Sequence, residues 1–148
     1  IFNSMSNEIV TIAIDAMGGE NSPQKTIEGL SMFLQKNKKN DFFFNLYGDE
    51  EKIKQELNKQ SIKSNNFKIH HTKSIVSDEE SPITAVKNSK DSSMWHTINS
   101  QIIHNSDISI SAGNTGVLFV ISRMILKTMK QINKPALAGL WPNKLGTN

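Results

Sequence analysis

Small polar residues and glycines gather where a short apolar stretch runs into a helix-like one. The stretch reads Asp107-Ile108-Ser109-Ile110-Ser111-Ala112-Gly113-Asn114-Thr115-Gly116 and continues into mostly apolar residues. A strand, a glycine-flanked turn and a helix in this order present backbone N–H groups to an anion, because a helix start carries unpaired donors and a partial positive charge. Glycine lacks a Cβ atom, so a ligand can approach the main chain closely. The pattern predicts an anion site around Gly113 and Gly116.

A second glycine turn, Asp15-Ala16-Met17-Gly18-Gly19, follows an earlier strand-like segment. Neither the dinucleotide pattern G-x-G-x-x-G nor the nucleotide pattern G-x-x-x-x-G-K-[ST] occurs in the chain, which counts against nicotinamide cofactors and P-loop nucleotides. We expect Gly18 and Gly19 to let the chain approach the anion and Asp15 to orient the turn. The plain alternative is a structural tight turn in which Asp15 is an internal cap.

Two adjacent hydroxyls, Ser92 and Ser93, stand where one helix-like segment yields to the next. Hydroxyl and N–H groups at a helix start can bind phosphate, so both serines are candidate phosphate contacts. The alternative is ordinary N-capping by one of them. Neither serine has an evident base partner in the sequence, so neither is assigned as a nucleophile.

Composition narrows the classes of partner. The chain has 148 residues, a usual length for one domain, with 17 Lys and Arg against 14 Asp and Glu and no Cys. The lysines are scattered rather than clustered, which argues against a nucleic-acid partner. The four histidines lack metal-ligand spacing, so no metal is expected. We expect residues 1–7 to be an extension or disordered, and residues 8–148 to be part of one α/β domain.

Apolar periodicity predicts alternating strands and helices. The expected strands cover residues 8–15, 42–47, 67–71, 107–111 and 136–141. The expected helices cover residues 23–36, 50–60, 83–89, 94–105 and 115–130, the first and third opening on Ser22-Pro23 and Ser81-Pro82 as caps. This order is typical of a three-layer α/β/α, Rossmann-like fold with a mainly parallel sheet. Both glycine turns then lie at carboxyl ends of strands, where such sheets bind ligands.

The last expected helix is apolar on most faces, so we expect it to pack on the sheet on one side and on something else on the other. His70 and His71 are expected to point to opposite faces of their strand.

Three phrases, taken in order and at their approximate spacing, resemble the bacterial phosphate acyltransferase family. They are Asp15-Ala16-Met17-Gly18-Gly19, Ser92-Ser93-Met94 and Ser111-Ala112-Gly113-Asn114-Thr115-Gly116, and Lys134-Pro135-Ala136-Leu137 is similar to a further segment of that family. The resemblance covers nearly the whole chain from Ile9, and departs mildly at Glu20 and Lys134. Members of the family are longer, so the resemblance implies the N-terminal part of such a protein, which would need its other half or a compensating oligomer.

The resemblance implies transfer of a fatty acyl group from acyl carrier protein to inorganic phosphate, without a cofactor. The acyl phosphate product would feed phospholipid synthesis through a downstream membrane glycerol-3-phosphate acyltransferase. The family's fold resembles that of phosphate acetyltransferases and isocitrate-type dehydrogenases, and its members are homodimers acting in the cytoplasm at the inner face of the membrane. On this hypothesis Asn114, Thr115 and the N–H groups of Gly113 to Gly116 hold phosphate or the developing oxyanion.

Two other classes of function remain open at this stage. An isocitrate-dehydrogenase-like oxidoreductase would need an arginine cluster and an acidic metal set, and Arg123 is the one arginine present. A non-catalytic phosphate-binding module would need only the turns themselves.

Overall fold

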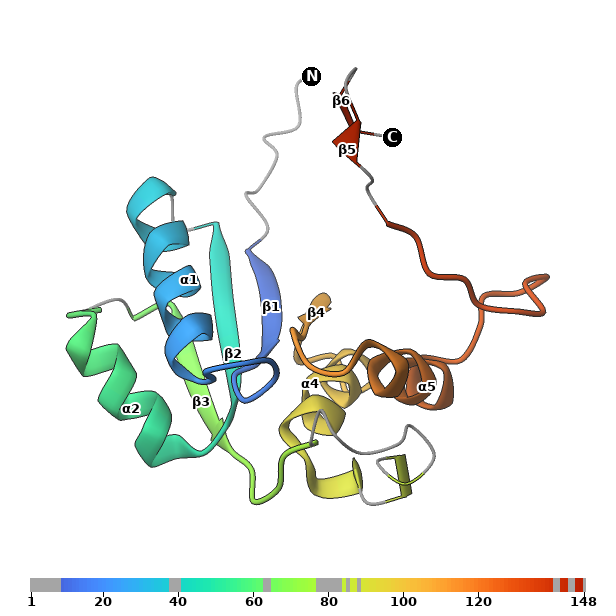
Figure 1. Ribbon diagram of the computed structural model, residues 1–148, viewed down its shortest axis with the longest axis horizontal. Coiled ribbons are helices and arrows are strands. Elements are labelled where there is room, and N and C mark those ends of the chain that lie inside the picture. Colours follow the sequence, from blue (N-terminus) through green and yellow to red (C-terminus); the bar gives the residue numbers. More distant parts are fainter. Residues whose placement is uncertain are drawn as a thin grey trace, which may run out of the picture.

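A four-stranded parallel sheet forms the centre of the computed structural model, which describes residues 9–37, 41–62, 65–76, 84, 86–87, 89–139, 142–143 and 146–147 (Figure 1). Its strands lie in the order β3-β2-β1-β4, with every neighbouring pair parallel. Their bounds are Val10–Asp15 for β1, Phe42–Gly48 for β2, Phe67–His71 for β3 and Ile108–Ile110 for β4. The β-branched and aromatic residues of these segments suit a pleated, buried surface.

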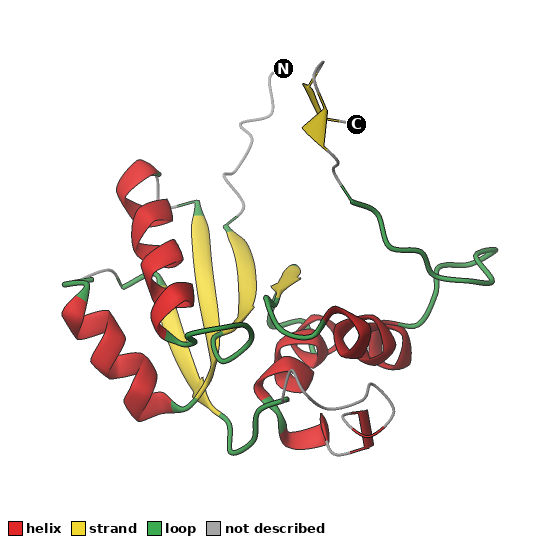
Figure 2. Ribbon diagram, in the orientation of Figure 1, coloured by secondary structure: helices red, strands yellow, loops and turns green. Residues whose placement is uncertain are grey.

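Helices cover both faces of this sheet, as Figure 2 shows. The helices are α1 (Gln24–Lys36), α2 (Glu50–Lys59), α4 (Ser93–Ile102) and α5 (Thr115–Leu126), with a short 3-10 turn, η1, over Ser89–Asp91. Helices α1 and α2 lie on one face, α4 lies on the other, and α5 packs on α4. The predicted three-layer α/β/α fold is therefore confirmed. Two short antiparallel strands follow, β5 (Pro142–Asn143) and β6 (Gly146–Thr147).

The face toward α1 and α2 is apolar throughout. Alternate residues of β1 and β2 point to it and meet the inward stripes of the two helices, as the period of two in strands and 3.6 in helices requires. The buried members of this core are Ile12, Ile14, Ala16, Ile27, Leu30, Phe44, Leu46, Ile53 and Leu57.

The face toward α4 carries a layer of buried polar side chains. Asn45 on β2 donates from Nδ2 to the Asn105 carbonyl at 2.8 Å and to Ser106 Oγ at 3.2 Å. Thr97 Oγ1 donates to the Ser93 carbonyl at 2.8 Å, and Thr97 itself is fully buried. Each hydrogen bond offsets the cost of removing a polar group from water, so this layer depends on its partners being in place.

The two histidines of β3 point to opposite faces, as predicted. His70 Nε2 lies 2.9 Å from Asn45 Oδ1, and its ring stacks on Tyr47 with centroids 4.6 Å apart. His71 Nδ1 accepts a hydrogen bond from the Glu50 N–H at the start of α2. Both histidine rings therefore make hydrogen bonds within the fold.

The structure corrects three expectations. Helix α5 does not lie on the sheet: its buried side chains, Val117 and Ile121, join Met94 and Ile98 of α4. Residues 136–139 have no regular structure, because a strand forms only where a neighbour supplies hydrogen-bond partners, and residues 140–141 lie outside the described part. Ser22 does not cap α1. The N-cap is Pro23, with no side-chain hydrogen bond, and Ser22 Oγ donates to the Gly18 carbonyl at 2.5 Å instead.

Residues 1–8, the expected cap Ser81-Pro82 and residues 83, 85 and 88 of the helix expected at 83–89 lie outside the described residues. Residues 84, 86 and 87 are helical, and Ser89 is the first residue of η1. None of the helices in the described part is long and apolar enough to cross a membrane.

Candidate functional site: two adjoining glycine turns

The two glycine turns lie side by side because β1 and β4 are neighbours. The register pairs Ile14 with Ile110, so Asp15 and Ser111 emerge together at the carboxyl edge of the sheet. There Ser111 Oγ donates to Asp15 Oδ2 at 2.7 Å. The prediction that both turns occupy one edge of the sheet is confirmed, although 96 positions of sequence separate these two residues.

Asp15 is enclosed beneath the turns, where only 2% of it is exposed. Its Oδ1 accepts from the Met17 N–H at 3.2 Å, which folds the first turn around the carboxylate. Burial raises the pKa of Asp15 above its ordinary value, while hydrogen bonds from the Ser93 and Ser111 hydroxyls and from the Met17 and Gly18 N–H groups lower it. Asp15 is thus an internal acceptor for both turns, as the alternative of a structural tight turn predicts. That Asp15 orients the first turn toward an anion stays a prediction.

Gly18 and Gly19 are required by close packing between the turns. A Cβ atom on Gly18 would lie 2.5 Å from Asp15 Oδ2 and 2.9 Å from the Gly113 nitrogen. Gly19 has a φ of +88°, in the left-handed region that favours glycine, and a Cβ there would lie 2.9 Å from the Ala112 carbonyl oxygen. These glycines therefore let one turn approach the other. Whether they also admit a ligand stays a prediction.

The second turn leads directly into α5. Asn114 is the N-cap, and its Oδ1 accepts from the Val117 N–H at 3.1 Å. The Gly113 N–H is directed inward to Ser111 Oγ at 3.1 Å. The N–H groups of Thr115 and Gly116 belong to the first helical positions, where no preceding turn supplies carbonyl acceptors. The donors best placed for an anion are therefore those of Thr115 and Gly116, whereas the Gly113 N–H is used within the protein.

The serine pair divides between two roles. Ser92 is the N-cap of α4, where its Oγ accepts from the Trp95 N–H at 3.1 Å, so the capping alternative describes it. Ser93 is the first residue of α4, is almost fully buried, and its hydroxyl hydrogen-bonds to Asp15. Ser93 therefore holds the Asp15 carboxylate, which in turn is hydrogen-bonded to both glycine turns.

Ser111 is the residue that the sequence reasoning missed. It stood within the conspicuous stretch but was assigned no role, because its partner on β1 is distant in sequence. The sequence did contain a signal. The Ser111 hydroxyl stands at the end of one strand, two residues before Gly113, and another strand of the chain ends in Asp15.

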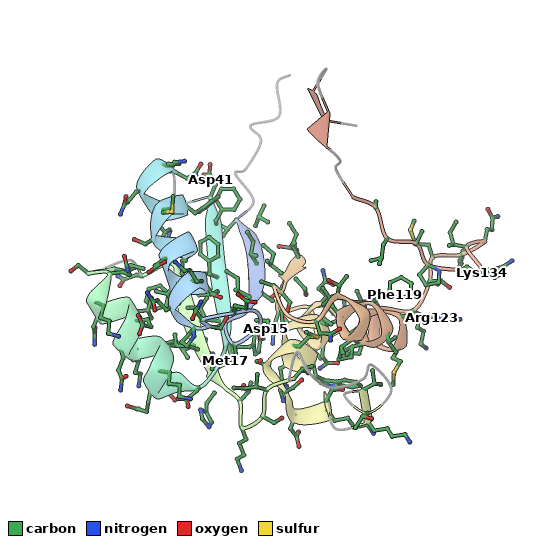
Figure 3. All side chains as sticks on the ribbon, in the orientation of Figure 1. Asp15, Met17, Asp41, Phe119, Arg123 and Lys134 are labelled. Carbon is green, nitrogen blue, oxygen red and sulfur yellow. The ribbon has the colours of Figure 1, made fainter. Side chains whose placement is uncertain are left out.

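Figure 3 shows Asp15 and Met17 near the end of β1 where it approaches the α4–α5 side, whereas Asp41 lies at the far end of the sheet. Phe119 and Arg123 are carried by α5, beyond its first turn. Among the described residues there is no group of three or more His, Asp or Glu side chains that could hold a metal ion. The arrangement offers main-chain donors, one threonine hydroxyl and a helix start, which together suit a small anion.

A sequence profile described as "Fatty acid synthesis protein" matches residues 10–148. Among curated proteins, the chain is 46% identical to the phosphate acyltransferase of Pelagibacter ubique over 138 residues, which are 93% of this chain and 40% of that protein. It is 40% identical to the phosphate acyltransferase of Magnetococcus marinus over 90% of this chain and 37% of that protein. The corresponding values for the Bradyrhizobium diazoefficiens protein of the same name are 38%, 93% and 38%. The chain thus spans about two fifths of the length of these curated relatives.

Proposed function

The chain belongs to the bacterial phosphate acyltransferase family, and from this premise we propose that it supplies the phosphate-holding part of an acyltransferase. The complete reaction would move a fatty acyl group from an acyl carrier protein thioester to inorganic phosphate and yield an acyl phosphate for phospholipid synthesis. The relatives' shared name supports the class of reaction. Acyl carrier protein as donor is the finer part of the proposal.

One observation carries the proposal: two glycine turns meet at the carboxyl edge of a parallel sheet, beside the start of α5. The Thr115 and Gly116 N–H groups and the Thr115 hydroxyl can donate to phosphate oxygens there, and the helix dipole favours the negative charge. Ligands of open α/β sheets bind at this edge. The buried Asp15 carboxylate is already satisfied by hydroxyl and N–H donors, so it needs no cation from the ligand.

Phosphate is itself a nucleophile, so the reaction needs no covalent intermediate on the protein. A phosphate oxygen would attack the thioester carbonyl carbon, forming the new C–O bond, and the C–S bond would then break to release the carrier's thiolate, which takes up a proton. The protein's task is to hold phosphate next to the carbonyl and to stabilise the developing oxyanion. Thr115 and Gly116 are the main candidates for this role, and the Asn114 amide lies next to them in the chain. Ser93 acts indirectly, through its hydrogen bond to Asp15.

The proposal extends to the setting of the reaction. We place the protein in the cytoplasm, at the inner face of the membrane, as a homodimer that passes acyl phosphate to a membrane glycerol-3-phosphate acyltransferase. No cofactor is part of this chemistry.

A chimaera tests the proposal directly. Residues 10–148 of this chain would replace the matched segment of the Pelagibacter ubique protein, and acyl phosphate would be measured after mixing with acyl carrier protein thioester and phosphate. We expect turnover, because the chain would bring its own pair of turns to the joint site. A folded chimaera that binds phosphate but makes no acyl phosphate would favour the non-catalytic phosphate-binding function.

Two substitutions in the chimaera locate the site. Asn114→Asp keeps a capping oxygen for α5 but places a negative charge beside the anion. Thr115→Val removes a hydroxyl donor while keeping the shape of the side chain. Loss of one oxyanion-type donor typically costs on the order of 10²–10³ in turnover, and we expect losses of that size for Asn114→Asp. Normal turnover and an unchanged KM for phosphate in both variants would rule out this site.

A further inference from the structure

We propose that Ser111 is a positioning residue that locks the two glycine turns together and thereby aims the N-terminal donors of α5 at phosphate. The inference rests on the proposed function. It assigns a role to a side chain whose hydroxyl is hydrogen-bonded to Asp15 and Gly113.

The Ser111 hydroxyl acts both as a hydrogen-bond donor and as an acceptor. Its O–H donates to Asp15 Oδ2 at 2.7 Å, and its oxygen accepts from the Gly113 N–H at 3.1 Å. The same oxygen would lie 2.8 Å from a Cβ atom on Gly18, so the first turn is packed directly against this hydroxyl. One side chain therefore contacts the carboxylate, the glycine of the first turn and the main chain of the second.

The bond to Gly113 fixes the direction of a peptide group just ahead of the helix. Gly113 is followed by Asn114, the N-cap of α5, and then by Thr115 and Gly116. A glycine has wide backbone freedom, so without a partner for its N–H this position could rotate and carry the following donors with it. The Ser111 oxygen removes that freedom. It also uses the Gly113 N–H inside the protein, so the N–H groups proposed to meet the anion are those of Thr115 and Gly116.

Ser109 provides a matched control. It lies two residues earlier on the same strand, and its Oγ donates to the Thr97 carbonyl of α4 at 2.9 Å. Ser109→Ala therefore removes one part-buried hydroxyl and one hydrogen bond, which joins β4 to α4. Ser111→Ala also removes one part-buried hydroxyl, but with it the two hydrogen bonds to Asp15 and from Gly113. A purely structural hydroxyl at Ser111 would behave as Ser109 does.

The test compares wild-type chain, Ser111→Ala, Ser111→Thr and Ser109→Ala. Two quantities are measured: the dissociation constant for inorganic phosphate by calorimetric titration, and amide hydrogen exchange at Gly113 by NMR, with thermal unfolding as a check on folding. For Ser111→Ala we expect about tenfold weaker phosphate binding and about tenfold faster exchange at Gly113, the size of the lost hydrogen bond from the Gly113 N–H to Ser111 Oγ. Ser111→Thr restores a hydroxyl and should recover most of both losses. Ser109→Ala should leave both values within about twofold of the wild type, because its hydroxyl lies outside the turns.

The outcomes separate this inference from the proposed function. If Ser111→Ala and Ser109→Ala shift both quantities equally, Ser111 is an ordinary structural hydroxyl and the inference is wrong. If the wild-type chain does not bind phosphate, the phosphate site itself fails, and with it the part of this inference that concerns aiming. The Gly113 exchange rates then still decide whether Ser111 couples the two turns, because that measurement needs no ligand.

Discussion

The two faces of the sheet are held by different kinds of interaction. Toward α1 and α2, side chains such as Leu46 and Ile27 are fully buried among other hydrocarbons. Toward α4, residues from the same strands meet hydroxyls, amides and a carboxylate, including Asn45 and Asp15. Adjacent positions on one strand therefore belong to two different kinds of core, because successive side chains point to opposite faces.

The two faces differ in how accurately their side chains must be placed. Hydrophobic burial is non-directional and scales with area, so the apolar face needs mainly the right volume. The polar face needs donors and acceptors at fixed distances, since a buried polar group without a partner is costly. Such a layer holds its surroundings in one arrangement. The two glycine turns adjoin this layer through Ser93 and Asp15, so the candidate site lies where the backbone is most narrowly specified.

Truncating Leu46 on the apolar face is expected to have the largest effect on stability. Leu46→Ala should lower the free energy of unfolding by about 2–5 kcal/mol, because it leaves a cavity in a close-packed core. Denaturant titration measures this loss. Leu137→Ala, at a side chain that is 68% exposed, is the control and should change little. Phosphate affinity of the folded Leu46→Ala chain should be unchanged, and a loss of affinity comparable with that of a turn variant would show that the two faces are not independent.

Adding one methyl group to a turn glycine should have an intermediate effect. In Gly18→Ala the new Cβ would lie within 3 Å of Asp15, Ser111 and Gly113, so the turns must separate. We expect a loss of about 1–3 kcal/mol in the free energy of unfolding, the usual cost of overpacking, together with weaker phosphate binding.

Gly29 is the matched control for that substitution. It lies within α1, where a Cβ would meet no atom within 4 Å, so Gly29→Ala should stabilise the helix by about 0.5–1 kcal/mol. If the two glycine variants changed stability in the same direction, the claim that Gly18 is required by contact between the turns would be wrong.

The elements that form the apolar face could be predicted from the sequence, whereas the hydrogen bonds of the polar face largely could not. Strand periodicity and helical spacing predicted β1, β2, β3, α1 and α2 to within a residue or two, because local patterns of buried hydrocarbon determine them. Partners such as Asn45 with Ser106, or Asp15 with Ser111, are 61 and 96 positions apart. The local sequence around a serine or asparagine does not show whether its side chain lies in solvent or in such a layer. Only the order of the strands in the sheet shows which polar side chains are hydrogen-bond partners.

The candidate site shows the same limit at closer range. The sequence predicted both turns and their shared edge, since parallel strands place their carboxyl ends together. It did not predict which N–H groups remain available, because that depends on Ser111 accepting from Gly113 and on Asn114 capping α5. Local rules also failed at Ser22, whose hydroxyl bonds to the preceding turn in place of the helix it was expected to cap.

The smallest expected effect is a change in pH dependence, and it compares carboxyl groups from the two sides of the molecule. Burial raises the pKa of Asp15 above its ordinary value of 3.8, so the folded chain binds this proton more tightly than the unfolded chain. Stability from this group is fully present below pH 3.8 and is lost as pH rises through the raised value. Asp15→Asn removes the titration. The stability of this variant relative to the wild type should therefore increase with pH across that window.

Glu28 on the outer surface of α1 supplies a control of opposite sign. Hydrogen bonds from Gln24 and Lys25 lower the pKa of Glu28 below its ordinary value of 4.5, so its contribution is present above pH 4.5 and is lost as pH falls through the lowered value. Glu28→Gln should therefore lose stability relative to the wild type as pH rises, where Asp15→Asn gains it. Denaturant titrations at several pH values between 3 and 7 measure both slopes. If the two variants had slopes of the same sign, burial would not be the dominant influence on Asp15, and the polar face would be more open to water than its hydrogen bonds indicate.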